Sequence, residues 1–298
     1  MPPFRDSHIH FIREGKPLPE KDLHAVAGAF LRNGILAADD MGHKSAVGLK
    51  ARKSSGANLR VRTAVCALFK RGGYGSFLGQ EIQGKEDIAP AIREVVDAGA
   101  DFIKIINSGV VDITGAGGVT AGGFSYEELK VICGAAGKRG LAVACHANGD
   151  EAIRDAVKAG VVSIEHGFFV SMETLHMMAE AKTAWTPTVF ALSSLAPALS
   201  PQQRGYVEDV VEAHLVSMAY AASIGVRLRV GTDSGSDGVE HGESFFEELR
   251  LFSKAGLSRG EIIAAACMED DEIGRGNYLL VRENFIETGK IEEIRKQG

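Results

Sequence analysis

Two histidines one residue apart stand near the start of the chain, in the apolar stretch RDSHIHF. Side chains alternate between the two faces of a strand, so His8 and His10 are expected to share one face, together with Asp6. A lone histidine in a strand more often packs in the core. Two imidazoles on one face indicate a metal site, because imidazole is the commonest metal ligand in proteins.

Four more groups of suitable chemistry each end an apolar run later in the chain. They are Lys104 in DFIKII, His146 in VACHANG, His166 in SIEHG and Asp233 in VGTDSG. Charged groups are costly to bury unless they are paired or bound to a metal. Each group alone has an ordinary structural explanation, such as a helix-capping role for Asp233. As a set they predict a metal centre.

Eight apolar runs alternate with amphipathic, helix-like stretches and would supply the strands that position these groups. The runs cover residues 3–11, 35–41, 59–68, 101–106, 141–146, 161–166, 183–192 and 226–233. This alternation predicts the α/β class and a single (β/α)8 TIM barrel over residues 1–298. A doubly wound sheet is the alternative. In a barrel all strand ends meet at one mouth, where barrel enzymes build their active sites.

Two long segments follow strands on that side of the predicted barrel. Residues 69–86 contain Arg71 and Tyr74, which could contact a substrate. Residues 107–124 hold six glycines. A phosphate-binding loop is one interpretation, but no Gly-Lys-Ser/Thr follows. We therefore favour a lid or a shaped substrate loop.

Composition limits the possible functions. The chain of 298 residues has a net charge of −6 and no long basic run, which argues against nucleic-acid binding. No window has the ~20 apolar residues that span a membrane, and we predict no leader peptide. The four scattered cysteines fit reduced thiols in the cytoplasm. We expect a small-molecule substrate as partner, no membrane contact, and a homo-oligomer.

The motif set resembles the amidohydrolase superfamily of metal-dependent hydrolases, and most closely its imidazolonepropionase-like and Xaa-Pro dipeptidase-like branch. The matching phrases are HIH, IKI, HANG, IEHG and GTD, in this order, and the resemblance covers roughly residues 5–265. It implies a binuclear centre, usually zinc, with N6-carboxylation of Lys104 to form a bridging carbamate. The implied ligands are His8, His10 and Asp233 for one metal, His146 and His166 for the other, and Lys104 for both.

The resemblance also implies a reaction. The metals would lower the pKa of a water that they share, and Asp233 would accept its proton and pass it to the leaving group. The expected bond is an amide or cyclic amide of a dipeptide-like or N-acyl amino acid substrate, contacted by His241, Tyr74 and Asn148. A lactonase or phosphotriesterase could use the same metals. An inactive metal-binding barrel and an aldolase with Lys104 as Schiff base are alternatives of other classes.

Two departures from the family pattern are visible. Most relatives carry a small β-sandwich built from both termini, and the sequence predicts that it is missing here, with only a short helical tail after the barrel. The second departure is Arg229 in VRLRVGTD. By alternation it shares a face with Asp233, and we predict that it pairs with Asp6 beneath the metals. The alternative is a register shifted by one residue, with Arg229 facing the helices.

Overall fold

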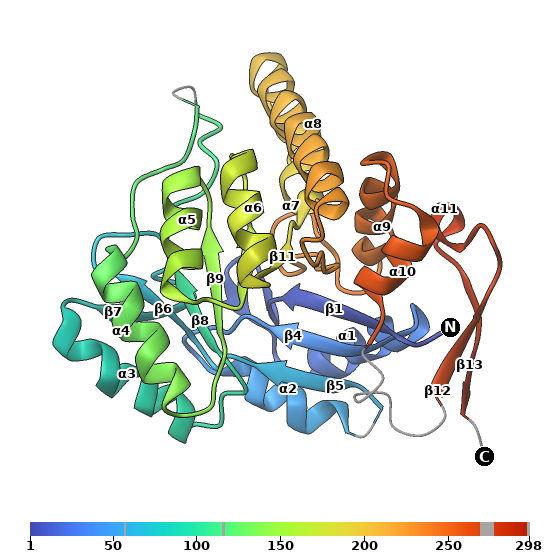
Figure 1. The fold of residues 1–298 in the computed structure, drawn as a ribbon. Helices are drawn as coiled ribbons and strands as arrows, with labels where there is room; N and C mark the ends of the chain where they lie inside the picture. Colours follow the sequence, from blue (N-terminus) through green and yellow to red (C-terminus); the bar gives the residue numbers. More distant parts are fainter. Residues whose placement is uncertain (57, 115–116, 269–276, 297–298) are drawn as a thin grey trace.

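Parallel strands form the inner part of the protein and helices surround them (Figure 1). The computed structural model describes residues 1–56, 58–114, 117–268 and 277–296. The strands are β1 (Phe4–Ile9), β2 (Ile12–Arg13), β3 (Lys16–Pro17), β4 (Ile35–Asp40), β5 (Arg60–Thr63), β6 (Ala67–Lys70), β7 (Gly79–Ile82), β8 (Ile103–Ile106), β9 (Val143–Ala147), β10 (Ser163–His166), β11 (Ala184–Thr186), β12 (Asn277–Val281) and β13 (Ile291–Lys296). The helices are α1 (Glu20–Arg32), α2 (Val47–Ser55), α3 (Lys85–Asp97), α4 (Tyr126–Gly137), α5 (Asp150–Ala159), α6 (Met172–Ala181), α7 (Val189–Ser193), α8 (Pro201–Ser223), α9 (Ser244–Lys254), α10 (Arg259–Ala266) and α11 (Phe285–Thr288).

Two parallel sheets contain most of the strands. Their orders are β1-β4-β5 and β11-β10-β9-β8-β6-β7. The segment 226–234 carries no regular strand, but its backbone bonds to both sheets. The N–H of Trp185 donates to the carbonyl of Arg227 at 2.9 Å, and the N–H of Ser7 donates to that of Val230 at 2.9 Å. This α/β arrangement with parallel strands is consistent with the TIM barrel predicted from the sequence.

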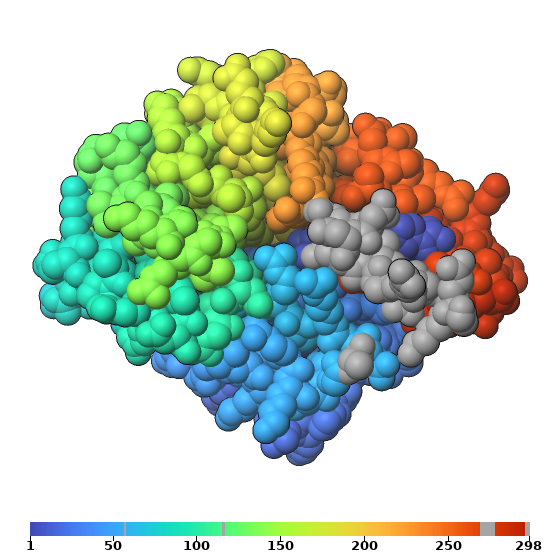
Figure 2. Space-filling view, turned by 60° about the horizontal axis from the view of Figure 1, so that its bottom comes forward, coloured from blue at the N-terminus to red at the C-terminus, as the bar shows by residue number. Residues whose placement is uncertain are grey.

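The helices follow the strands in chain order around the outside. Local sequence explains several of their starts: the hydroxyl of Ser125 accepts the N–H of Glu128 at the start of α4, and Ser258 and Glu261 form the same capping box at α10. Figure 2 shows one face of the molecule, on which the colours run round in order from the blue N-terminal part to the orange and red C-terminal part. Such an order is typical of repeated strand–helix units.

Two predicted strands and one predicted loop differ in detail. The run 59–68 is divided into β5 and β6 because Val65 adopts φ +66°, a left-handed conformation that breaks a strand. The segment 69–86 is not a plain loop, since it contains β7 paired with β6. The run 183–192 ends as β11 at Thr186 and continues as α7, after Thr188 at φ +46°.

The expectation that Asp6 shares a face with His8 and His10 is wrong. Asp6 pairs with Ala38 and Ile9 with Asp40, so three steps along β1 match two along β4. This extra residue is a β-bulge, and it reverses the alternation after Asp6. The carboxylate of Asp6 instead accepts the backbone N–H of Thr232 at 3.0 Å and its hydroxyl at 2.7 Å.

The predicted pairing of Arg229 with Asp6 is wrong for the same reason. Thr232 occupies both oxygens of Asp6, and no ion pair joins Asp6 to Arg229. Burial and the neighbouring Arg227 lower the pKa of Arg229, while Glu165 and Asp39 partly offset this effect. Arg229 therefore lies among the charged groups of Arg5, Asp39 and Glu165.

The C-terminal tail is only partly helical. Helix α10 follows residue 258 as expected, but β12 and β13 then form an antiparallel pair with the one-turn α11 between them. This hairpin is tied to the start of the chain, because the N–H of Leu279 donates to the carbonyl of Met1 at 2.8 Å. Phe4 packs against Phe285 with ring centroids 5.9 Å apart. The absence of a larger accessory sandwich stays a prediction.

None of the helices in the described part of the chain has the length and apolar character needed to cross a membrane.

Candidate metal centre

Three of the predicted ligands come together from two neighbouring segments. His8 and His10 lie at the end of β1, and the backbone N–H of Asp233 donates to the carbonyl of His8 at 2.8 Å. Asp233 adopts φ +58°, which turns its side chain back toward the histidines. Its Oδ1 lies 3.3 Å from Nε2 of His8 and 3.6 Å from Nε2 of His10. One ligand atom from each residue lies within 4.8 Å of the others.

Hydrogen bonds on the far side of each ring fix which nitrogen faces Asp233. Nδ1 of His8 donates to the carboxylate of Glu165 at 2.8 Å, and Nδ1 of His10 donates to the carbonyl of Gly42 at 3.0 Å. A carbonyl can only accept, so Nε2 of a neutral His10 carries the lone pair. Both Nε2 atoms therefore present lone pairs toward Asp233 when the rings are neutral, an arrangement that a cation would stabilise.

Electrostatics differ among the three members of this triad. Burial lowers the pKa of His10 to about 3, so this ring is neutral at pH 7. Burial alone would raise the pKa of Asp233, but the contact with His8 and the charges of His8 and His10 more than offset this and bring it to about 2. Burial and Lys104 act to lower the pKa of His8, yet Asp233 and Glu165 outweigh them and raise it. Asp233 is thus an anion facing two imidazoles.

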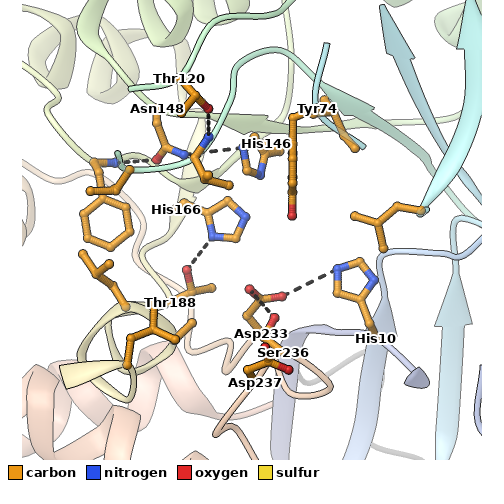
Figure 3. Close-up of a pocket in the computed structure, with 18 of the residues that line it drawn as sticks. His10, Tyr74, Thr120, His146, Asn148, His166, Thr188, Asp233, Ser236 and Asp237 are labelled. Carbon is orange, nitrogen blue, oxygen red and sulfur yellow. Dashed lines mark hydrogen bonds and ion pairs between the residues drawn. The ribbon is translucent and has the colours of Figure 1, made fainter. Parts of the chain in front are cut away.

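The other three predicted ligands lie beside this triad, on β8, β9 and β10. The rings of His146 and His166 have centroids 4.5 Å apart, and His166 lies 4.9 Å from His8. Nε2 of His146 donates to the carbonyl of Gly109 at 2.9 Å, and Nδ1 of His166 bonds the hydroxyl of Thr188 at 2.7 Å. Nδ1 of His146 and Nε2 of His166 are the nitrogens left for a metal (Figure 3).

Lys104 is the strongest sign of an incomplete site. Its side chain is buried, and Nζ has no hydrogen-bond partner within the described residues. Nε2 of His8 is likewise buried without a bond of acceptable geometry. Burial lowers the pKa of Lys104, which favours the neutral amine that can react with carbon dioxide. An orphaned buried amine beside histidine lone pairs fits the predicted carbamate and metal ligands.

A cavity of about 390 Å³ opens over these groups and contains all six predicted ligands. Tyr74 and Asn148 also line it, as predicted. In Figure 3 the hydroxyl of Tyr74 points into the space between the histidines and Asp233. The amide of Asn148 is already engaged, since its Nδ2 donates to the carbonyl of Gly109 at 3.2 Å and its Oδ1 accepts the N–H of Phe168 at 3.0 Å.

His241 and Arg71 lie away from this cavity. Nε2 of His241 donates to the carbonyl of His10 at 2.8 Å, and its ring lies between Phe11 and Phe30. It therefore supports β1 from behind. Burial lowers its pKa to about 4, so it is neutral there. The guanidinium of Arg71 is exposed and bonds Oε1 of Gln83 at 3.1 Å.

Sequence reasoning missed the residues that orient the ligands. Glu165 on His8, Thr188 on His166 and Ser236, whose hydroxyl donates to Oδ2 of Asp233 at 3.0 Å, were not singled out. Glu165 directly precedes His166 in the IEHG phrase, so a carboxylate next to a ligand was a usable signal. Thr188 and Ser236 gave no signal of this kind.

Comparison with known proteins decides the family. Residues 1–269 match the amidohydrolase family. The chain belongs to the amidohydrolase family. This confirms the resemblance inferred from the motifs.

Individual amidohydrolases and related proteins resemble this chain over different lengths. Ochratoxinase of Aspergillus niger is 30% identical over 160 residues, which are 52% of this chain and 33% of that protein. An uncharacterized protein of Mycobacterium tuberculosis is 26% identical over 194 residues, 63% of this chain and 51% of that protein. The matched regions thus span about half of one of these curated relatives and a third of the other. The crystal structure of a Xaa-Pro dipeptidase, with 24% identity, superposes with a TM-score of 0.81 over 100% of this chain and 86% of that one.

Proposed function

We propose that this amidohydrolase cuts an amide bond with a binuclear metal centre, usually zinc in the family. The observation that carries the proposal is the convergence of histidine lone pairs and the Asp233 carboxylate beside the buried, unpartnered amine of Lys104. The residues that would hold the metals are His8, His10 and Asp233 on one side, His146 and His166 on the other, and a carboxylated Lys104 between them. The parallel sheets would close through segment 226–234 into an eight-stranded barrel.

When bound, the metals would supply Lewis acidity and lower the pKa of a water toward neutrality. Side chains of the protein would then transfer the proton of this water. Asp233 is anionic and faces the cavity, so it can accept a proton from the water and deliver it to the amide nitrogen. The water oxygen bonds to the carbonyl carbon, the carbon–nitrogen bond breaks, and a carboxylic acid and an amine result.

Tyr74 is placed to bind the carbonyl oxygen. Burial and the charge of Asp233 raise the pKa of its phenol, so the hydroxyl stays protonated. A protonated hydroxyl can donate a hydrogen bond to an acceptor in the cavity. Its ring lies 5.6 Å from that of His146. We therefore assign Tyr74 as a hydrogen-bond donor to the substrate. The cytoplasmic location and the homo-oligomer predicted from the sequence stay proposals.

Amide cleavage is favoured over lactone or phosphotriester cleavage by the names of two similar proteins, the ochratoxinase and the Xaa-Pro dipeptidase. Both are names of amide-cutting or related hydrolases, and neither refers to a lactone or a phosphotriester. An inactive metal-binding barrel is disfavoured because the sequence retains all six candidate ligands, including Asp233, and all six line one cavity. A Schiff-base aldolase would leave four histidines at the cavity without a role.

The test combines metal content with turnover. The protein is purified, loaded with zinc and bicarbonate, and analysed for metal, and amides, lactones and phosphotriesters are then assayed with and without a chelator. About two metals per chain and chelator-sensitive amide cleavage are expected. Absence of metal after loading would overturn the metal centre, and cleavage of lactones or phosphotriesters alone would overturn the assigned bond.

A further inference from the structure

The cavity above the metal centre is walled mainly by hydrocarbon. The apolar lining residues belong to two packed clusters: Ile12, Leu78 and Ile106 with Phe77 in one, and Phe168 and Leu192 in the other. All of these except Phe77 are buried. The segment 107–124 adds Val110, Val111 and Ile113 at the opening. An amide bound in this cavity would thus meet apolar surface from two separate clusters.

The polar side chains of the cavity are mostly already engaged with the protein. Thr120 accepts the N–H of Val110 at 3.0 Å, and Thr114 donates to Asp112 at 2.6 Å. Thr188, Asn148 and Ser236 are bonded as described above. Among the lining residues that the structure describes, the candidate ligands apart, only the side chains of Tyr74 and Asp237 make no hydrogen bond to the protein, and Asp112 uses one of its two oxygens.

Charge at the cavity is one-sided. No arginine lines it in the described part of the chain, and its one lysine, Lys104, lies buried at the floor. Two carboxylates stand nearer the opening: Asp237 is exposed, and Asp112 is half-buried. Asp112 accepts the backbone N–H and the hydroxyl of Thr114, which lower its pKa and keep it anionic.

The segment that carries Asp112 is held in place by helix α8. Nε2 of Gln203 donates to the carbonyl of Ile113 at 3.1 Å, and the backbone N–H of Gly118 donates to the hydroxyl of Tyr206 at 2.8 Å. Asp112 is therefore a fixed part of the opening. Cations bound at the metal centre would lie at the floor beside Asp233 and Lys104, where the scissile carbonyl is expected, and would leave the charge of the opening unbalanced.

We propose that the site takes amides whose acyl and amine parts are both apolar and carry no free carboxylate. The inference rests on the proposed function in taking this cavity as the place where the amide is cut. A carboxylate next to the scissile bond would lose its water against apolar walls, find no arginine or free lysine, and face Asp112 and Asp237. Negative selection of this kind determines specificity as effectively as attractive contacts. Free dipeptides and N-acyl amino acids are then poor substrates.

A matched pair of ligands tests the proposal. N-benzoyl-phenylalanine and N-benzoyl-2-phenylethylamine have the same two rings and the same amide and differ by one carboxylate. Binding of each is measured by calorimetry on the metal-free protein, and release of benzoate is measured on the metal-loaded protein. We expect the neutral compound to bind about tenfold more tightly or better, with a matching preference in kcat/KM. Equal or tighter binding of the carboxylate, or no binding of either compound, would overturn the proposal.

The two measurements separate this inference from the proposed function. A preference for the neutral compound in binding, without cleavage of any amide by the metal-loaded protein, would overturn the proposed function and support the selectivity. Amide cleavage with a preference for the carboxylate compound would support the proposed function and overturn the selectivity.

Variants at the opening locate the selectivity. The double substitution Asp112→Asn and Asp237→Asn should reduce the binding preference severalfold, and Ile113→Arg should improve binding of the carboxylate compound. Asp209→Asn on the exposed face of α8 and Val131→Arg on α4 are the matched controls and should leave the preference unchanged. Because Asp237 is exposed and Ile113 half-buried, at least one variant is expected to fold, which a thermal melt verifies. An unchanged preference in both folded variants would contradict the role of the opening.

Discussion

The two halves of the proposed metal centre are built differently. His8 and His10 already face a carboxylate, Asp233, and their ligand atoms lie within 4.8 Å of one another. His146 and His166 have no carboxylate of their own, and their neighbour Lys104 is an amine without a partner. The first half contains its anion in the sequence, whereas the second would obtain one only by carboxylation of Lys104. We therefore expect the activity of this protein to depend on carbon dioxide, because one half of the site needs a carboxylated Lys104.

Removing the anion of the first half should have the largest effect. The substitution Asp233→Asn keeps the size of the side chain but removes both a metal ligand and the proton acceptor. We expect kcat/KM on a cleaved amide to fall by about 10³-fold or more. Steady-state kinetics with metal analysis measures it.

Asp237→Asn, four residues further along, is the matched control for Asp233→Asn. It lies at the opening and should keep the metal content of the wild type. An Asp233→Asn protein with normal turnover would remove Asp233 from the mechanism.

Removing the amine of the second half should separate the two halves. Lys104→Met fills a similar volume but cannot form a carbamate. We expect the metal content to fall from about two ions to about one, with the remaining ion in the half formed by His8, His10 and Asp233, and turnover to fall about 10²-fold or more. Elemental analysis and kinetics measure both effects.

The wild-type protein supplies the matching test without mutation. Metal reloading in buffer purged of carbon dioxide should reproduce the Lys104→Met result, and added bicarbonate should restore the second metal. A protein that takes up two metals equally well with and without bicarbonate would contradict the carbamate and make the two halves equivalent.

Weakening the support of His8 should affect the first half moderately. Glu165→Gln replaces the carboxylate that accepts Nδ1–H at 2.8 Å with a weaker neutral acceptor. Such supporting bonds hold the ring and raise its basicity, and we expect a loss of about tenfold in metal affinity. Competition with a metal chelator measures it, and Glu151→Gln, at an exposed position of α5, is the control. Equal affinity in Glu165→Gln and wild type would limit Glu165 to a structural role.

The sequence predicted candidate ligands that the structure gathers at one cavity, but it did not predict the residues that support them. Strand alternation placed His8 and His10 on one face because that rule needs only neighbouring residues. It failed for Asp6, because a bulge depends on how β1 pairs with β4, and this pairing is not local. The predicted pairing of Arg229 with Asp6 was wrong because of the same bulge. Partners such as Glu165 for His8 are 157 positions apart, and only the fold brings them together.

Loops show the same limit. Eight strand-like runs predicted the α/β arrangement, since each run reflects burial of consecutive residues. The place of His241 behind β1 could not be read from its motif, because the HG phrase does not say toward which side of His10 the ring points. The left-handed conformations at Val65 and Thr188, which divide or end strands, occur at residue types that do not favour them.

Removing the support of His166 should have a smaller effect than removing that of His8. Thr188→Val keeps the shape of the side chain and removes the hydroxyl that bonds Nδ1 at 2.7 Å. A neutral hydroxyl restrains the ring less than a carboxylate, so we expect a loss of about threefold to tenfold in affinity for the second metal only. Titration of the metal-free protein, following the two binding steps separately, measures it. A loss in the first step instead would reverse the assignment of Thr188 to the second half.

The last prediction concerns stability rather than metal binding, at a residue that contacts the second half only through the turn at Thr188. Glu248 on α9 is buried, and its carboxylate accepts the N–H groups of Val189 and Phe190, next to Thr188. Burial outweighs these bonds and raises the pKa of Glu248 from 4.5 to about 8. Between these two values the folded protein retains a proton that the unfolded chain releases, so this group's contribution to stability falls as the pH rises from 4.5 to 8 and is constant above.

Glu248→Gln isolates that contribution, since the glutamine is neutral at every pH. The buried neutral histidines act in the opposite direction at acidic pH, so the informative quantity is the difference between the two proteins. We expect the free energy of unfolding of the metal-free wild type to decrease relative to Glu248→Gln by on the order of 2 kcal/mol from pH 5 to pH 8. Urea unfolding at several pH values measures it, with Glu247→Gln on the same helix as control. Parallel dependences of the unfolding free energy on pH in the two proteins would mean that Glu248 is ionised in the folded protein. The charge of Glu248, rather than its burial, would then hold the turn at Thr188 beside His166.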